Sequence, residues 1–479
     1  MRVEILGDAP AEQPGVRIFD SAEAPADPAV LEELARGVRD ADLAAPPVVL
    51  PDFHHKSDME MPSSIAVATR ETIRPVLTSS SVNCGMALIA LDAEVPGDRE
   101  VAAFFRQVRE RYPYPPTRRR DLRVDDVVRA AIDGGGFASE RFDVDPSELE
   151  RVEHDGRLAV EPFGGEDAIR RLLPRMTFEL SRMRFGTIGP SNHFVELQKV
   201  EEVLDRDAAD RLGVREGQLT LQYHGGGGVL ASQVGRLFGR RQKMSAKHRF
   251  FMGLQKPGFH LRGVRSLADL QLRRSLYFSG HCPPVPRYSA EGERFMLANA
   301  VAMNYGFAFR LSTYASLRAI AADVLGATGS RLIVDSPHNS IYEEEVAGET
   351  AVVHRHNSCR AFPASAMRAG TTFAETGQAL LVPGTYKTSS YLCVAADDTA
   401  ASLHSACHGT GTMIDRAAAL GISGSDPGAH RTLRFRYADA APTEVPHLDD
   451  RGISQGLAIL VEHGLVRPVA RMRPMGVLN

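Results

Sequence analysis

The stretch QLTLQYHGGGGVLASQVGRLF, residues 218–238, carries the pattern that decides the fold class. Its first half alternates apolar and polar side chains, as a half-buried strand does, and ends at His224. Four glycines follow, and the apolar residues beyond them recur at helical spacing. The stretch therefore predicts a strand, a tight turn and a helix, which indicates an α/β (α+β) protein. Such folds often place site residues where a strand ends.

Composition narrows the class of protein. The chain has 479 residues, of which 43% are hydrophobic and 24% charged, as in ordinary folded proteins. The formal net charge of −4 gives no overall basic field for nucleic acid, so an anion site must be local. The five cysteines are scattered, which does not fit a disulfide framework and favours a reducing cytoplasm. We expect neither a signal peptide nor a membrane span.

Helix and strand patterns alternate along the rest of the chain. Helices are expected around 28–40 and over 98–112, 124–135, 166–183, 293–326 (the longest) and 452–466. Strands are expected within 45–55 and 64–92, and over 331–339, 349–357, 378–386 and 467–479. Residues 112–123 are expected to form a surface excursion, and 424–448 a loop-rich region. Since no repeat or long linker divides these elements, we expect a single catalytic domain over residues 1–479.

Five chemically reactive side chains lie in polar segments beside glycine or asparagine, where strands are expected to end. They are Cys84, His193, His224, His338 and His408. Their irregular spacing excludes a zinc-finger pattern, and spacing alone leaves a site and a set of structural histidines equally open. The glycines after His224 form neither a P-loop nor a dinucleotide-binding motif. A hydrolase oxyanion loop would require a GxSxG elbow, and GISGS at 421–425 has the wrong spacing.

A series of motifs resembles the RtcB family of RNA-splicing ligases, in the family's order, from about residue 50 to 479. The segments are LPDFHH (50–55), VNCGMAL (82–88), GTIGPSNHFVELQKVEEV (186–203), YHGGGG (223–228), DSPHNSIYEEE (335–345), VVHRHNSCRAFP (352–363), VPGTYKTSSY (382–391), CHGTGTMIDRAAA (407–419) and VARMRPMGVLN (469–479). The resemblance implies that family's fold, with one domain around a central metal and nucleotide site.

The resemblance also implies an activity. Members of the family join RNA carrying a 3′-phosphate or 2′,3′-cyclic phosphate to RNA with a 5′-hydroxyl, using GTP and one or two Mn²⁺ ions, and some need an activating partner protein. The family's nucleophile, which forms a His–GMP phosphoramidate, matches His408, and Asp52 is expected to assist the incoming hydroxyl. The implied metal ligands are Cys84, His193, His224 and His338. The implied nucleotide-binding residues are Asn192, Phe194, Glu196, Asn339, Thr385, Ser390, His408 and Asn479.

Several positions depart from the family pattern. Ser81 stands where the family has a metal-binding aspartate, and Asn479 where it has a lysine. Basic residues of the family are replaced by Ala87, Gly228, His356 and Thr412. Each lost charge-assisted hydrogen bond to phosphate is worth about 1.5–3 kcal/mol. The candidate substitutes are Asp58 or Glu60 for the second metal, and Lys56, Arg360 and Lys387 for phosphate.

Three functions therefore remain open at this point. The first is an RtcB-type ligase acting on RNA ends. The second is a diverged ligase that transfers a nucleotide to a substrate other than RNA, an idea motivated by the lost basic residues. The third is a non-catalytic binding protein on the same scaffold. The basic clusters RRRDLR (118–123) and GRRQKMSAKHR (239–249) are expected either to follow a polynucleotide backbone or to form solvated surface.

Overall fold

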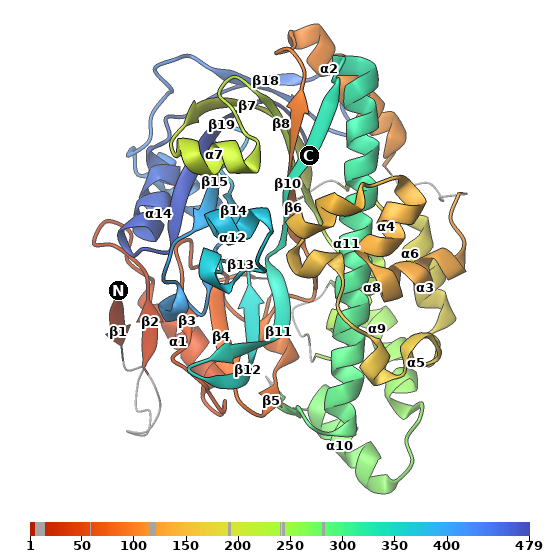
Figure 1. Cartoon of the computed structure of the whole chain (residues 1–479). Helices are drawn as coiled ribbons and strands as arrows, with labels where there is room; N and C mark the ends of the chain where they lie inside the picture. The colour runs from red at the N-terminus through yellow and green to blue at the C-terminus, as the bar shows by residue number, and fades with distance from the viewer. Residues whose placement is uncertain are drawn as a thin grey trace.

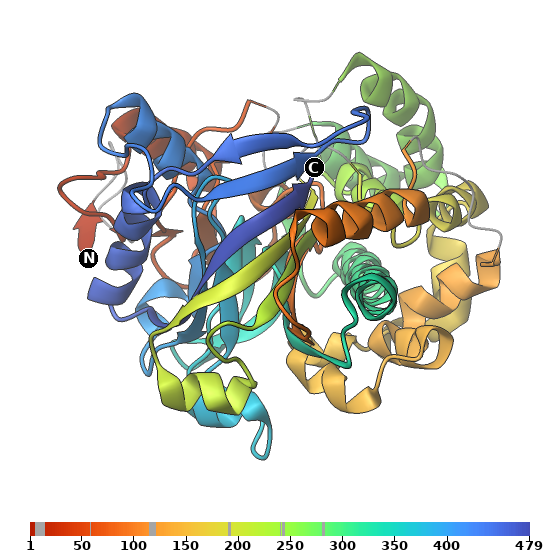
Figure 2. The same ribbon diagram turned by 90° about the horizontal axis from the view of Figure 1, so that it is seen from above.

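A computed structural model gives the fold for residues 1–4, 15–57, 59–114, 121–189, 193–239, 241, 245–279 and 283–479. The described elements form two large sheets with helices packed outside them, which confirms the predicted mixed α/β class (Figures 1 and 2). Among the described residues, no helix combines the length and the apolar character needed to cross a membrane.

The larger sheet is mostly antiparallel and contains nine of the described strands. Its main path runs through β10 (Gly329–Pro337), β6 (Gly85–Asp92), β8 (Leu219–Gly225), β7 (Phe194–Val203), β19 (Val466–Leu478), β15 (Ser390–Ala395) and β14 (Ala379–Val382). A hairpin of β17 (Arg431–Phe435) and β18 (Thr443–Pro446) joins it through a parallel pairing of β17 with β19. Thus β8, the strand predicted to end at His224, lies inside the sheet.

The second sheet has six of the described strands, and one of them follows β10 of the larger sheet after a single residue. Its order is β1 (Arg2–Glu4), β2 (Val16–Ile18), β3 (Val48–Val49), β4 (Ile65–Thr69), β12 (Glu349–His356) and β11 (Asn339–Val346). In the larger sheet Pro337 pairs with Gly85, and in the second sheet Asn339 pairs with His356. His338 therefore lies at the joint between the two sheets.

A buried helix of 36 residues, α11 (Ala290–Leu325), packs along one side of the larger sheet. Its apolar residues occur all round its circumference, which is the pattern of a helix surrounded by protein. Shorter helices enclose it, and Figure 2 shows it nearly end-on among them. They are α2 (Asp98–Arg111), α3 (Val124–Asp133), α4 (Gly135–Phe142), α5 (Gly165–Leu172), α6 (Arg175–Met183) and α8 (Gly228–Leu237). On the other side of the molecule, α13 (Gly411–Ala419) packs on α14 (Arg451–Glu462).

Most of the expected elements are confirmed, including the strand–turn–helix of 218–238, the longest helix and the closing strand. The helical stretch 166–183 is two helices, because Pro174 interrupts the pattern between α5 and α6. Most of 424–448 is loop, as expected, but the region also contains two strands that were not predicted, β17 and β18. Part of the excursion at 112–123 and part of each basic cluster lie outside the described residues.

Candidate metal and nucleotide site

Cys84, His193, His224 and His338 come together from four separate segments. The sulfur of Cys84 lies 3.2 Å from Nε2 of His224 and 3.6 Å from Nε2 of His193. Nε2 of His224 lies 3.0 Å from Nε2 of His338. Donor atoms of Cys84, His224 and His338 all lie within 4.8 Å of one another, and all three residues are buried. This arrangement has the geometry of a metal site.

The strand register produces this convergence. Met86 on β6 pairs with His224 on β8, and His224 also pairs with Phe194 on β7. Cys84 directly precedes β6, and His193 directly precedes β7, so both lie at the end of the sheet where His224 is found. The backbone N–H of His338 donates to the carbonyl of Cys84 at 2.8 Å, which brings the fourth donor to the same end.

The loop before Cys84 is held by α11. The guanidinium of Arg310, fully buried with Asp335, contacts both oxygens of that carboxylate and also donates to the carbonyl of Asn83 at 2.6 Å. Gly306, one turn earlier, faces Asn83 so closely that a Cβ there would lie 2.6 Å from the Asn83 amide nitrogen. Sequence reasoning missed this support, although a lone arginine inside the apolar run FAFRLS was the available signal.

The donor set suits a transition metal. Burial lowers the pKa of His193 and brings that of His338 well below its usual value, so both imidazoles are neutral and keep a lone pair for a ligand. Burial also raises the pKa of Cys84 to about 11, partly opposed by a hydrogen bond with Ser81. A divalent cation would favour the thiolate form. A thiolate among imidazoles matches the preference of borderline metals, and the buried Nδ1 of His338 has no hydrogen-bond partner among the described residues.

His408 lies against this cluster. It follows β16 (Ser405–Cys407), and its ring stacks on that of His338 with centroids 3.6 Å apart and planes 2° from parallel. Its ring centroid is 5.4 Å from that of His224. Burial lowers the pKa of His408 to about 3, with Lys56 acting in the same direction. The imidazole is therefore neutral at physiological pH, the form in which its nitrogen is a nucleophile.

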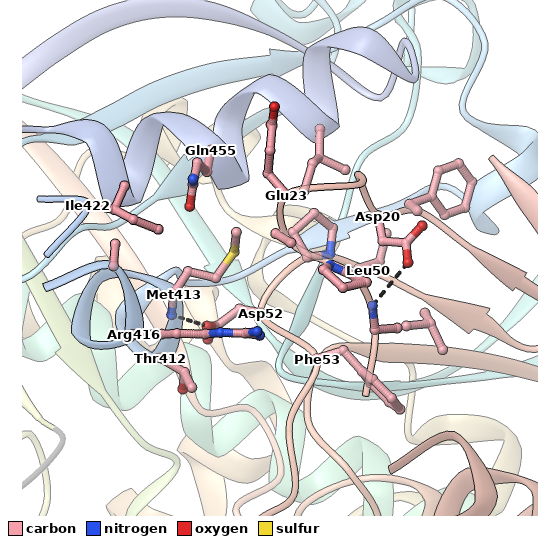
Figure 3. Close-up of a pocket in the computed structure, with 18 of the residues that line it drawn as sticks. Asp20, Glu23, Leu50, Asp52, Phe53, Thr412, Met413, Arg416, Ile422 and Gln455 are labelled. Atoms are coloured by element: carbon pink, nitrogen blue, oxygen red, sulfur yellow. Dashed lines mark hydrogen bonds between the residues drawn. The ribbon is translucent and has the colours of Figure 1, made fainter. Parts of the chain in front are cut away.

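Asp52 joins a second loop to the one that carries the nucleophile. Its backbone adopts a positive φ of 63°, and its carboxylate accepts the backbone N–H of Met413 at 2.9 Å. Figure 3 shows this bond on the wall of a pocket, beside Thr412 and the flat side chain of Arg416. Burial raises the pKa of Asp52 to about 7. Its carboxyl group therefore exchanges a proton near neutral pH, as a general base must.

Two of the expected nucleotide-binding residues lie on β7, next to the end of β19. Glu196 is buried and pairs with Val477 of β19. This is the second-last residue pair between β7 and β19. Glu196 accepts a hydrogen bond from Gln198 at 2.6 Å, and burial raises its pKa to about 7. Phe194 begins the strand, and its ring lies 5.8 Å from that of His224, while Asn479 follows the last residue of β19. These residues therefore extend from the metal cluster along the sheet.

The other expected nucleotide-binding residues are Thr385, Ser390, Asn339 and Asn192. Thr385 and Ser390 belong to one loop, in which the N–H of Gly384 donates to the Ser390 hydroxyl at 3.1 Å. The amide of Asn339 is used internally, because its nitrogen donates to the carbonyl of Ser81 and its oxygen accepts from the N–H of Asn357. Asn192 lies outside the described residues.

Two of the candidate substitutes have other partners. Glu60 is buried in an ion pair with Arg241 at 3.2 Å, and no carboxylate of the described residues joins the metal cluster. Arg360 forms an ion pair with Glu344 at 3.0 Å, and its Nη1 lies 2.9 Å from a ring nitrogen of His154. Glu60 is therefore not a metal ligand in this arrangement, and Arg360 shares the carboxylate of Glu344 with Arg355. Asp58 lies outside the described residues.

Lys56 is different, because its charge acts on the site itself. Burial lowers the pKa of His338 most, followed by the charges of His408 and His224, and Lys56 lowers it further. For His408, burial is again the largest cause of the lowered pKa, and Lys56 is the second. Lys387 lies in the loop of Thr385, with its ammonium nitrogen 5.8 Å from the centre of the Tyr386 ring. Of the three predicted cations, Lys56 is the one whose charge lowers the pKa of the candidate nucleophile.

Comparison with known proteins gives a consistent result. The sequence model of a family described as tRNA-splicing ligase RtcB matches residues 42–479. A tRNA-splicing ligase RtcB from Thermococcus kodakarensis is 27% identical over 90% of this chain and 86% of its own length. The RNA-splicing ligase RtcB of Mycobacterium bovis is 29% identical over 74% of this chain and 77% of its own. The one from Pyrococcus furiosus is 28% identical over 74% of this chain, and the match spans about a third (34%) of that relative. The chain belongs to the tRNA-splicing ligase RtcB family.

Proposed function

We propose that this protein is an RNA ligase that joins a 3′-phosphate or 2′,3′-cyclic phosphate end to a 5′-hydroxyl end, with GTP as the nucleotide and His408 as the nucleophile. The observation that carries the proposal is the neutral His408 ring stacked on His338 beside the cluster of Cys84 and His224. Family membership supports it, as do the names of the relatives.

The first step would form a bond between a His408 ring nitrogen and the α-phosphorus of GTP, while the bond to pyrophosphate breaks. A 2′,3′-cyclic phosphate end would first be opened by water, which leaves a 3′-phosphate and a 2′-hydroxyl. An oxygen of the RNA 3′-phosphate would then attack the same phosphorus and break the P–N bond, which frees His408. Finally the 5′-hydroxyl would attack the activated 3′-phosphate and GMP would leave. Asp52, whose pKa is about 7, would take the hydroxyl proton in this last step.

Cys84, His193, His224 and His338 would hold Mn²⁺, which when bound neutralises phosphate charge. The positions of His338, His408 and Glu196 suggest the following roles for their side chains. The stacking on His338 would hold the half-buried His408 ring in one plane for attack on the α-phosphorus. Glu196 would accept hydrogen bonds from the N–H edge of guanine, which adenine does not present in the same pattern.

A diverged ligase that acts on something other than RNA remains the second candidate. The observation in its favour is the loss of basic residues at Ala87, Gly228 and Thr412, together with the ion pair that occupies Arg360. In this case His408 would still accept a nucleotide, but the acceptor would be a different phosphate or acid.

One experiment tests both candidates. The protein is incubated with Mn²⁺ and α-labelled GTP or ATP, and an adduct that is labile to acid and stable to alkali is sought. We expect the adduct with GTP and its loss in His408→Ala, whereas Cys407→Ser, next to it in sequence, keeps it. We also expect the protein to join RNA with a 3′-phosphate to RNA with a 5′-hydroxyl, and this result would support the full proposal. An adduct without joining favours the second candidate, and the absence of any adduct refutes both and leaves a binding protein.

A further inference from the structure

A groove opens from the metal cluster on the side of His193. Ser81, His193 and Gly226 line it, together with Arg184, Arg236, Tyr114 and His248. Among the described residues that line it, none is acidic, although Asp and Glu outnumber Lys and Arg in the whole chain, 60 to 56. A cationic groove on an acidic protein concentrates anions locally. This groove therefore meets the requirement for a local anion site.

Two arginines of this groove have no ion-pair partner in the described part of the chain. Arg236, on α8, donates to the carbonyl of Ser232 at 3.4 Å, and Arg184 follows α6. Neighbouring arginines in the sequence do form ion pairs, as Arg182 does with Glu179 and Arg241 with Glu60. Burial lowers the pKa of Arg236, and Arg241 adds to this effect. A partly buried guanidinium without a counter-charge gains most from a bound phosphate.

Other groups in the groove suit a nucleotide rather than a bare phosphate. Tyr114 is 49% exposed, and its ring lies 5.8 Å from that of Tyr437, which supports it from behind. The amide oxygen of Gln233 is buried and has no hydrogen-bond partner among the described residues, and a ribose hydroxyl would donate to it. An aromatic face beside arginines is the usual construction for single-stranded nucleic acid.

One wall of the groove includes a residue of α9 (Ala246–Leu261), a helix that sequence reasoning did not anticipate. His248 lines the groove, and Phe251 lies three residues further on, on the same face of the helix, with 47% of its surface exposed. The exposed Phe250 packs edge-on against Phe251 with ring centroids 5.8 Å apart. These rings provide further stacking surface beyond the groove.

We propose that this groove holds the single-stranded RNA end that carries the 3′-phosphate, with Arg184 and Arg236 on its backbone phosphates and a base stacked on Tyr114. The inference rests on the proposed function. It assigns the contacts with the RNA backbone to arginines on α8 and after α6, and not to the four positions at which basic residues are replaced by Ala87, Gly228, His356 and Thr412.

The test measures binding of a short, fluorescently labelled single-stranded RNA with a 3′-phosphate, by anisotropy, between about 50 and 200 mM salt. We expect Arg184→Gln and Arg236→Gln each to weaken binding about tenfold. Each should also reduce the slope of log K against log salt by about 0.7. The matched control is Arg206→Gln, an exposed arginine on α7 (Arg206–Leu212), which Figure 1 shows apart from α8. It should change neither quantity.

The aromatic contact has its own test. Tyr114→Leu should weaken binding about tenfold, while Tyr114→Phe should keep it, because only the ring is required. Thermal unfolding of each variant identifies any that is misfolded. The inference is overturned if the double arginine variant binds RNA with the affinity and salt slope of the wild type, or if Arg206→Gln has the same effect.

Failure of this inference is distinguishable from failure of the proposed function. The nucleotide adduct of the wild-type protein is measured without RNA. If the adduct forms but the arginine variants bind RNA normally, only the groove assignment is wrong. If RNA binds with the expected dependence on both arginines but no adduct forms, the groove assignment holds and the proposed reaction is wrong.

Discussion

Replacing Asp335 by Asn should destabilise the whole protein, because it leaves the Arg310 charge buried without its partner. Both side chains have 0% exposure, and Arg310 makes three contacts of 2.6–3.0 Å with the carboxylate. Removal of one member of a buried pair typically costs about 3–5 kcal/mol. We therefore expect Asp335→Asn to reduce the free energy of unfolding by about that amount, measured by urea denaturation followed by circular dichroism.

Two controls make this prediction specific. The double variant Arg310→Met, Asp335→Leu removes both charges and should cost less than Asp335→Asn alone, since no unpaired charge remains. Arg215→Gln breaks an exposed ion pair with Asp92, of 2.8 Å, whose side chains are 65% and 49% exposed. It should cost less than about 1 kcal/mol. If Asp335→Asn is no worse than Arg215→Gln, the reasoning about the buried pair is wrong.

Three further predictions concern the site. The pKa of Asp52 is about 7 in the folded protein and near 3.9 in the unfolded chain, so the folded state binds this proton more tightly. The resulting stabilisation is complete at a pH below about 3.9 and is lost as the pH rises through about 7. Asp52→Asn should remove up to about 4 kcal/mol of that pH dependence, which urea denaturation from about pH 4 to 8 would measure; a difference from wild type that does not vary with pH contradicts it. Cys84→Ser should abolish the thiolate absorption band of bound Co²⁺, whereas the buried Cys359→Ser should retain it, and a band that persists without Cys84 excludes it as a ligand. Glu196→Gln should lower adduct formation with GTP about 10- to 100-fold and leave any reaction with ATP nearly unchanged, in assays with labelled nucleotides, and an equal loss for both would argue against a role in base recognition.

The strand–turn–helix around His224 was predictable because its pattern is local: alternation, then glycines, then helical spacing. The hairpin β17–β18 was not, because Pro, Gly and charged residues dominate that region and its pairing partner, β19, lies far along the chain. Helix α9 also escaped prediction, since its sequence exposes Phe250 and Phe251 and so lacks a clear apolar face.

The candidate site was also predictable only in part from the sequence. Periodicity and spacing left the role of Cys84, His193, His224 and His338 open, and the order of motifs identified them as a set. Their convergence depends on the register of three strands and on the joint between two sheets, which no short segment specifies. The pairing of Glu60 with Arg241 is likewise a tertiary contact between residues 181 positions apart.

The close approach of Gly306 to Asn83 sets a limit on engineering this protein for heat resistance. Exchange of glycine for alanine inside a helix ordinarily stabilises the helix by about 1 kcal/mol. Gly306 of α11 is therefore an obvious position for such a substitution. Here the new methyl group would press on the loop that positions Cys84, because its nearest atoms would be only 2.6–2.8 Å away. Gly306→Ala should therefore lower the melting temperature instead of raising it, and a design that replaces helical glycines to gain stability should leave this position unchanged.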